Sequence, residues 1–351
     1  MTPETLASWA NNALYSSMVV FTLAMLAFAT HLSARAPRRA EERAAAERTD
    51  ALVGAGVGAA GSTTATLPGE GTTDPARDRT GAAGAGAAGA SGAAYGPESV
   101  RSRQWGSIGL TLTYLATALL VGSVVLRGIA VTRPPWGNMF EFATAAVAAV
   151  GVAYSLLARR NRWEWLGVFI VTPILLVLGL SVTVLYTEAH ELMPALKSYW
   201  LAIHVTVAFL AVALFTIAAA VGAVYLVRRR REEHPPARPN FIESLPSAAA
   251  LERTAYSLNM GAFILWTFTL IAGAIWAKQA WGAYWQWDPK EVWTFVIWAV
   301  YAAYMHSRAT AGVDARKSMY IALAGYAAVI INFTAVNLVS TFVGMHNYSG
   351  M

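Results

Sequence analysis

Long apolar stretches recur along this chain, and they constrain its fold more than any other feature of the sequence. A helix needs about 20 residues to cross the hydrocarbon core of a bilayer. The composition agrees, since only 13% of the 351 residues are charged, against about 25% in a soluble domain. The sequence therefore predicts an all-α, polytopic bundle of about eight transmembrane helices. The stretches cover residues 13–34, 107–126, 138–158, 165–186, 200–227, 255–277, 289–306 and 318–343.

The net charge of +6 would suit nucleic-acid binding, but the basic residues lie in short clusters beside the apolar stretches. This is the positive-inside pattern of membrane proteins, so we expect membrane lipid and no nucleic acid as a partner. The clusters lie within residues 35–39, 159–162, 228–231 and 308–317. If they are cytoplasmic, both termini and the loops 127–137, 187–199 and 278–288 lie outside. Glu4, with no basic residue before the first stretch, argues against a cleavable signal peptide.

Three parts are expected along the chain. Residues 1–35 form the first transmembrane helix, and residues 105–351 form a seven-helix membrane domain. Residues 36–104 are rich in Ala, Gly and Thr, and their run GAAGAGAAGASGAA has no large apolar side chain to bury. This composition predicts a disordered cytoplasmic linker.

Cysteine is absent from the chain. This excludes a thiol–disulfide enzyme, an iron–sulfur protein and a Cys-ligated zinc site. Any thiol in the chemistry of this protein must come from a partner.

Residues 276–293 read WAKQAWGAYWQWDPKEVW and hold a dense group of tryptophans. One or two Trp would indicate only an aromatic belt at the membrane interface. Four rings within seven residues exceed what anchoring needs, and they suit a flat, apolar macrocycle with a polar edge. These rings belong to Trp281, Tyr284, Trp285 and Trp287. We interpret them as an aromatic shelf, with interfacial anchoring as the alternative.

A helix is predicted to begin directly after the shelf. Asp288 suits the N-cap, Pro289 the first helical position, and Glu291 the third position of a capping box. The shelf is therefore expected at the outer surface, next to a rigid helix. Two roles are open for the charged residues of this turn, Asp288, Lys290 and Glu291. They orient the shelf or the carboxylates of a bound macrocycle, or they only cap the helix.

The topology sorts the six histidines. His204 lies about one turn into a helix that begins at the outer face, and His346 directly follows the last helix. Two neutral imidazoles on opposite sides of a metal form an axial pair, and imidazole is a common haem ligand. His190 is an outer alternative in a more polar loop.

Three histidines lie toward the inner face. His306 ends the helix that follows the shelf, and it either extends toward the interface or has a function at membrane depth. His31 lies at a similar depth on the first helix, and whether the two face each other is open. His234, in a loop rich in Pro and Arg, is expected to be solvated.

The segment from Trp281 to Glu291 resembles the tryptophan-rich WWD signature of haem-handling proteins. It is most similar to the CcsA/ResC type of the system II cytochrome c maturation machinery, often named CcsB in actinobacteria. Three other segments agree: PWGNMFE at 135–141, LMPALKSYW at 192–200 and GMHNY at 344–348. The resemblance covers roughly residues 106–350.

This resemblance implies that His204 and His346 hold the iron of an outer haem, a haem b that is bound as substrate. It also implies that His306 holds the iron of a second haem within the membrane, with a ligand from a ResB-type subunit. His31 is a weaker candidate for that second ligand. The cofactor-binding residues expected from it are Trp281, Trp285, Trp287, Asp288, His204, His346 and His306.

The implied function is cytochrome c maturation in the plasma membrane, with an extracytoplasmic active face. Haem would be presented for thioether attachment to the CXXCH motifs of apocytochromes c. The chain would act with its ResB-type subunit as a holocytochrome c synthase, or haem lyase, and a thiol-reducing partner would keep the cysteines reduced. No side chain is expected to act as a nucleophile. The alternatives are a haem transporter or chaperone without lyase chemistry, an electron-transfer subunit, and a membrane scaffold.

Overall fold

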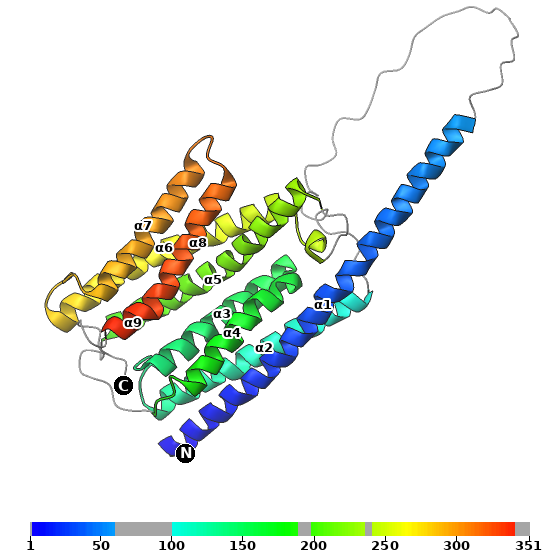
Figure 1. Cartoon of the computed structure of the whole chain (residues 1–351). Coiled ribbons are helices and arrows are strands. Elements are labelled where there is room, and N and C mark those ends of the chain that lie inside the picture. The colour runs from blue at the N-terminus through cyan, green and yellow to red at the C-terminus, as the bar shows by residue number, and fades with distance from the viewer. Residues whose placement is uncertain (1, 60–99, 189–197, 236–240, 341–351) are drawn as a thin grey trace, which may run out of the picture.

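The computed structural model describes residues 2–59, 100–188, 198–235 and 241–340, with side chains up to residue 35 in the first range and up to 337 in the last. These residues form helices joined by short loops, with no strand among them (Figure 1). The helices are α1 (Pro3–Ala59), α2 (Val100–Ala130), α3 (Met139–Asn161), α4 (Gly167–Thr183), α5 (Tyr199–Glu233), α6 (Ala248–Trp281), α7 (Pro289–Ala309), α8 (Ala315–Phe333) and α9 (Ala335–Ser340), with short 3-10 turns η1 (Glu164–Leu166) and η3 (Phe241–Ser244). The all-α prediction is confirmed.

Seven segments of the described chain are long and apolar enough to cross a membrane. They correspond to α1, α2, α3, α4 with η1, α5, α6 and α8 with the start of α9. The remaining predicted span, α7, has 21 residues, which is about 31 Å of helix. Its Trp and Tyr side chains are less hydropathic than aliphatic ones. The protein is therefore a multi-pass membrane protein of seven or eight spans.

Two helices differ from their predicted limits. Helix α1 begins at Pro3 and continues to Ala59, so its backbone is helical where the linker was expected to begin. Residues 36–59 are rich in Ala, Glu and Arg, which are strong helix formers. The last predicted span is broken at Thr334, which separates α8 from α9. Residues 60–99 of the predicted linker lie outside the described residues.

Close contacts between small and large residues join the helices. Helix α1 packs on α2, α5 on α6, and α7 on α8, while α3 contacts α2, α4 and α5. Between lipid-exposed helices there is little hydrophobic driving force, so association depends on close packing. The fully buried ring of Phe28 in α1 shows this packing, because a Cβ at Gly109 or Gly167 would lie 2.7 or 2.4 Å from it. Only glycine fits at these two positions in α2 and α4.

The described residues of the loops predicted to be outer lie at one end of the bundle, here named the Trp-loop end (Figure 1). Asn11 near the start of α1 donates a hydrogen bond of 3.1 Å to the Tyr186 hydroxyl after α4. Ser198 before α5 donates one of 2.9 Å to Gln279 near the end of α6. The predicted alternation of loops between the two ends is thus present in the fold.

The basic clusters after residue 100 lie at the opposite end. There Arg229 pairs with Asp314 at 2.7 Å, and Arg316 pairs with Glu233. These pairs connect the end of α5 to the loop before α8. The separation of the basic clusters from the Trp-loop end is the feature that the positive-inside pattern predicts.

Candidate functional site

The loop between α6 and α7 is shaped by its own sequence. Helix α6 ends at Gly282, whose φ of 82° is in the left-handed region that glycine adopts readily. Helix α7 begins with the predicted capping box. Asp288 accepts a hydrogen bond of 2.9 Å from Lys290 N, and Glu291 Oε2 accepts from Asp288 N at 3.2 Å and Gln286 N at 2.8 Å. The loop is therefore fixed at both of its ends.

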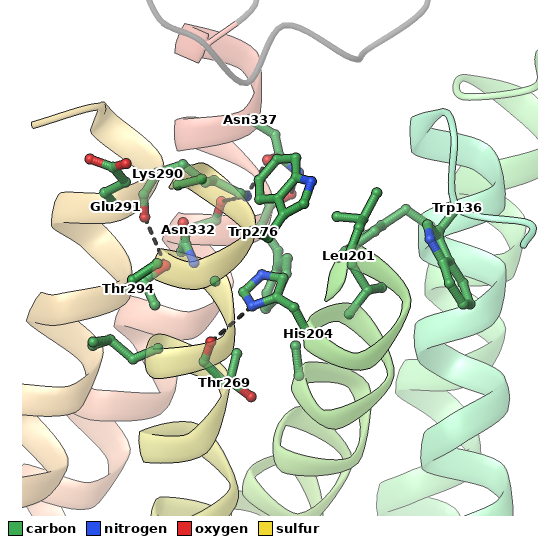
Figure 2. A pocket seen from close by; sticks show the side chains of 18 of the residues that line it. Trp136, Leu201, His204, Thr269, Trp276, Lys290, Glu291, Thr294, Asn332 and Asn337 are labelled. Atoms are coloured by element: carbon green, nitrogen blue, oxygen red, sulfur yellow. Dashed lines mark hydrogen bonds between the residues drawn. The ribbon is translucent and has the colours of Figure 1, made fainter. Parts of the chain in front are cut away.

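A cavity opens beside this loop at the Trp-loop end, with about 1230 Å³ of space when its mouth is included (Figure 2). Its walls come from the loop before α3, from α3, α5, α6, α7, α8 and α9, and from the α6–α7 loop. The aromatic side chains that line it are Trp136, Phe142, Trp266, Trp276, Trp281, Tyr284, Trp285 and Phe333. The polar ones are Asn138, His204, Thr269, Lys290, Glu291, Thr294, Asn332 and Asn337.

His204 lies in the α5 wall of the cavity, and its ring packs against three residues of α6. Its Nδ1 is 2.9 Å from the Thr269 carbonyl oxygen, which only accepts, so in the neutral ring Nδ1 carries the proton and Nε2 the lone pair. The ring stacks on Trp276 with centroids 6.3 Å apart and an interplanar angle of 17°. Gly273 of α6 leaves room for it. A hydrogen bond from the second ring nitrogen to a carbonyl oxygen is the kind that orients a metal-ligating imidazole.

The predicted aromatic shelf is only partly present. Trp281, Tyr284 and Trp285 line the cavity, but Trp287 is 78% exposed and does not. Within the shelf, the rings of Trp285 and Trp287 also meet edge to face, at 87°, instead of lying in one plane. The prediction of one flat shelf was therefore wrong. Trp287 also has a φ of 61°, a left-handed backbone conformation that is rare for a bulky residue.

The wall formed by Trp136 is held by a buried charge cluster. Glu141 is fully buried and accepts from Arg127 at 3.0 Å, from Arg133 at 2.7 Å and from Gly137 N at 2.9 Å. Asn138 caps α3 by accepting from Glu141 N at 2.9 Å. The PWGNMFE segment therefore fixes the loop that carries Trp136.

The wall across from His204 is polar and comes from three helices. Lys290 of α7 donates to the Asn332 carbonyl oxygen of α8 at 2.8 Å and also to Asn337 Oδ1 of α9. Its ammonium lies 5.0 Å from the centroid of the Phe333 ring. Lys290 thereby connects α7 to the helix break at Thr334, which presents Asn332 and Asn337 to the cavity.

The other candidate residues lie apart from the cavity or outside the described residues. Asp288 is buried as the N-cap of α7 but does not line the cavity. His306 is exposed at the far end of α7, and His31 is buried in α1, 2.7 Å from the Ser102 carbonyl oxygen. Helices α1 and α7 lie on opposite sides of the bundle, so these two histidines do not face each other (Figure 1). His190 and His346 lie outside the described residues.

His234 is exposed at the end of α5, as predicted. Sequence reasoning overlooked the residues that support His204, namely Thr269, Gly273 and Trp276. They recur at positions 269, 273 and 276, a helical spacing that marks one face of α6. That spacing was a usable signal once α6 was expected to pass beside His204.

This architecture defines a class: an all-helical, multi-pass membrane protein with a histidine-containing aromatic cavity at one end. A family model described as cytochrome C assembly protein matches residues 136–343. The chain belongs to this family. The family implies an involvement of haem.

Individual relatives agree with this assignment. The chain is 29% identical over 296 residues to a cytochrome c biogenesis protein CcsA of Synechococcus sp. (strain JA-3-3Ab), covering 69% of this chain and 84% of that protein. It is 31% identical over 265 residues to the CcsA protein of Prochlorococcus marinus (strain NATL2A), covering 68% and 83%. Against the CcsA protein of Chlamydomonas reinhardtii the identity is 35% over 162 residues, covering 46% and 44%.

Proposed function

We propose that this protein holds haem b as a substrate at the extracytoplasmic face of the plasma membrane. It presents this haem for thioether attachment to CXXCH motifs of apocytochromes c, in a system II machinery with a ResB-type subunit. The observation that carries the proposal is the position of His204. A histidine whose Nδ1 is fixed by a carbonyl oxygen stands in the wall of an aromatic cavity, in a chain of the cytochrome c assembly family.

The residues of the cavity fit a haem. Its walls are mostly apolar and aromatic, as suits a flat macrocycle, and polar groups are few. Neutral imidazole is a common axial ligand, and the Thr269 hydrogen bond leaves the lone pair of His204 on Nε2. His346 supplies the second axial ligand in this proposal. Trp281 and Trp285 contact the macrocycle, while Trp287 and Asp288 act through the shape of the loop.

The reaction needs thiols from the substrate because the chain has no cysteine. In each attachment the sulfur bonds to the inner carbon of a vinyl group, and the thiol proton ends on the terminal carbon. The electrons balance only if the cysteines are reduced, so a thiol-reducing partner is needed. The contribution of this chain is positioning, which supplies about 7–11 kcal/mol for well-oriented reactants.

A second haem within the membrane belongs to the same proposal. His306 is exposed at the end of α7 away from the cavity. An imidazole there would bind the iron of a haem whose other ligand comes from a neighbouring subunit. We assign that other ligand to the ResB-type partner. The seven-helix domain 105–351 carries both sites, with residues 1–35 and the linker 36–104 as its N-terminal extension.

The proposal is tested by purifying the full chain with a ResB-type partner in mild detergent. Absorption spectra and pyridine haemochrome assays are recorded for the wild type, His204→Gly and His234→Gly. We expect six-coordinate haem in the wild type, loss of the outer haem but not of the second haem in His204→Gly, and recovery of the lost part of the spectrum when imidazole is added. His234→Gly is the control, because His234 is an exposed histidine at the opposite end of α5.

Haem content that is the same in all three proteins would refute the proposed role of His204. Formation of covalent haem on an added apocytochrome c by the purified complex tests the lyase step. Haem binding without that product would favour a transporter or chaperone.

A further inference from the structure

One cation stands in the cavity wall. Lys290 is the only Lys or Arg among the described residues that line the cavity, and it comes from the first turn of α7. Its ammonium donates to the Asn332 carbonyl oxygen at 2.8 Å and to Asn337 Oδ1. Both acceptors are neutral. An ammonium has three N–H donors, so two of them are used in the part of the chain that the structure describes.

Helix stability does not explain a lysine at this position. The first turn of a helix carries partial positive charge, and a cation there is unfavourable. The neighbouring carboxylates accept backbone hydrogen bonds, Asp288 from Lys290 N and Glu291 Oε2 from Gln286 N and Asp288 N. No Asp or Glu of the described residues forms an ion pair with the Lys290 ammonium within 4.0 Å.

A partly buried ammonium that lacks a direct ion pair costs free energy, because burial removes part of its water. A carboxylate that enters the cavity would offset this cost by a charge-assisted hydrogen bond. The Lys290 side chain is held in place for such a contact by Asn332 and Asn337 (Figure 2). The wall is therefore arranged for a ligand that is flat and apolar but carries an anionic edge.

We propose that Lys290 binds a carboxylate of the ligand, which is a propionate of the haem in the proposed function on which this inference rests. Contacts at two points, His204 on α5 and Lys290 on α7, fix the rotation of the macrocycle in its own plane. The propionate edge lies against the α7–α8 wall. The vinyl groups, on other edges of the ring, then point away from that wall and toward the incoming thiols.

The test compares haem with its dimethyl ester, in which both propionates are neutral. The full-length wild type, Lys290→Met and Lys278→Met are titrated with each compound in detergent, and binding is followed by absorption. We expect the wild type to bind haem about tenfold or more tightly than the ester, as for a hydrogen bond between charged groups. Lys290→Met should bind both compounds equally.

Lys278→Met is the matched control. Lys278 is an exposed lysine at the same end of the bundle, and its ammonium contacts the Gly282 carbonyl oxygen at 2.7 Å outside the cavity lining. This variant should keep the wild-type preference for the free acid. A purely structural role of Lys290 would weaken both compounds by the same factor and leave their ratio unchanged.

Equal affinity of the wild type for haem and its ester overturns the inference, whatever the variants do. If Lys290→Met does not fold, Lys290→Arg keeps the charge and must keep the preference. Failure of the proposed function looks different, since the wild type would then bind neither compound, which overturns both ideas.

Discussion

Gly273→Ala tests the support of His204 without changing any side chain that is proposed to bind haem. A Cβ at position 273 would lie 2.7 Å from His204 Cε1 and 2.8 Å from Nδ1. Carbon atoms pack at about 3.5–4.0 Å, so the ring must retreat by about 0.8 Å or more. Thr269 belongs to the same helix as Gly273, so a ring that moves away from α6 lengthens its 2.9 Å hydrogen bond to about 3.7 Å.

The expected result is a weaker haem site in a folded protein. At about 3.7 Å the hydrogen bond from Nδ1 is lost, and its net contribution is about 0.5–1.5 kcal/mol. Loss of the group that orients a ligating histidine typically lowers metal affinity by about 10–100-fold. Haem retention by Gly273→Ala should fall by a factor in this range, measured by pyridine haemochrome after gel filtration of the complex.

Gly261→Ala is the control on the same helix. A Cβ there meets only Leu214, at 3.7 Å, which is ordinary contact. Both changes carry the same gain in helix propensity, up to about 1 kcal/mol, so Gly261→Ala should be neutral or slightly stabilising. Equal haem retention by the two variants would refute the claim that Gly273 makes the space for the His204 ring.

Two further predictions concern stability. Glu141→Gln leaves Arg127 and Arg133 without their buried carboxylate, so we expect a loss of about 3–5 kcal/mol in the free energy of unfolding. The exposed Glu188→Gln is the control, and similar thermal unfolding of both variants in detergent would contradict the reasoning. The hydrogen bond from Arg316 N, together with Arg229, holds the pKa of Asp314 below its ordinary value. The ionised Asp314 carboxylate therefore stabilises the fold at every pH above its ordinary pKa. This stabilisation is lost below about pH 4, as the pH falls through the lowered pKa of the folded protein. Asp314→Asn keeps an N-cap but removes the charge that pairs with Arg229. The unfolding temperature of this variant should therefore be lower than that of the wild type at pH 7, and the difference should vanish in acid.

The start of α7 shows how much of a site can be read from local sequence. Asp288, Pro289 and Glu291 fixed the helix start, because capping depends only on residues three or four positions apart. The positions of the membrane helices were predictable for a similar reason, because the length and hydropathy of each apolar stretch can be read without knowing its neighbours in space. The break at Thr334 was not predictable, because an apolar stretch reads the same with or without an interruption.

Contacts between distant segments were beyond reach of the sequence. The partners of Lys290 lie 42 and 47 positions away, and Thr269 lies 65 positions from His204. Only packing decides which residues meet at such separations. The exposed position of Trp287 was also missed. Its positive φ is rare for a bulky residue and has no sequence signal of its own.

The division of labour between the helices follows from where the cavity walls lie. The lining begins at Trp136 and ends at Asn337, nearly the range that the cytochrome c assembly family model matches. Helices α1 and α2 contribute no lining residue among those described, so they act on the site indirectly. Their connection is the buried Arg127, which joins α2 to Glu141 and so to the loop of Trp136. The first two helices therefore support the cavity by holding one of its walls, and the cavity itself is lined by the helices that follow.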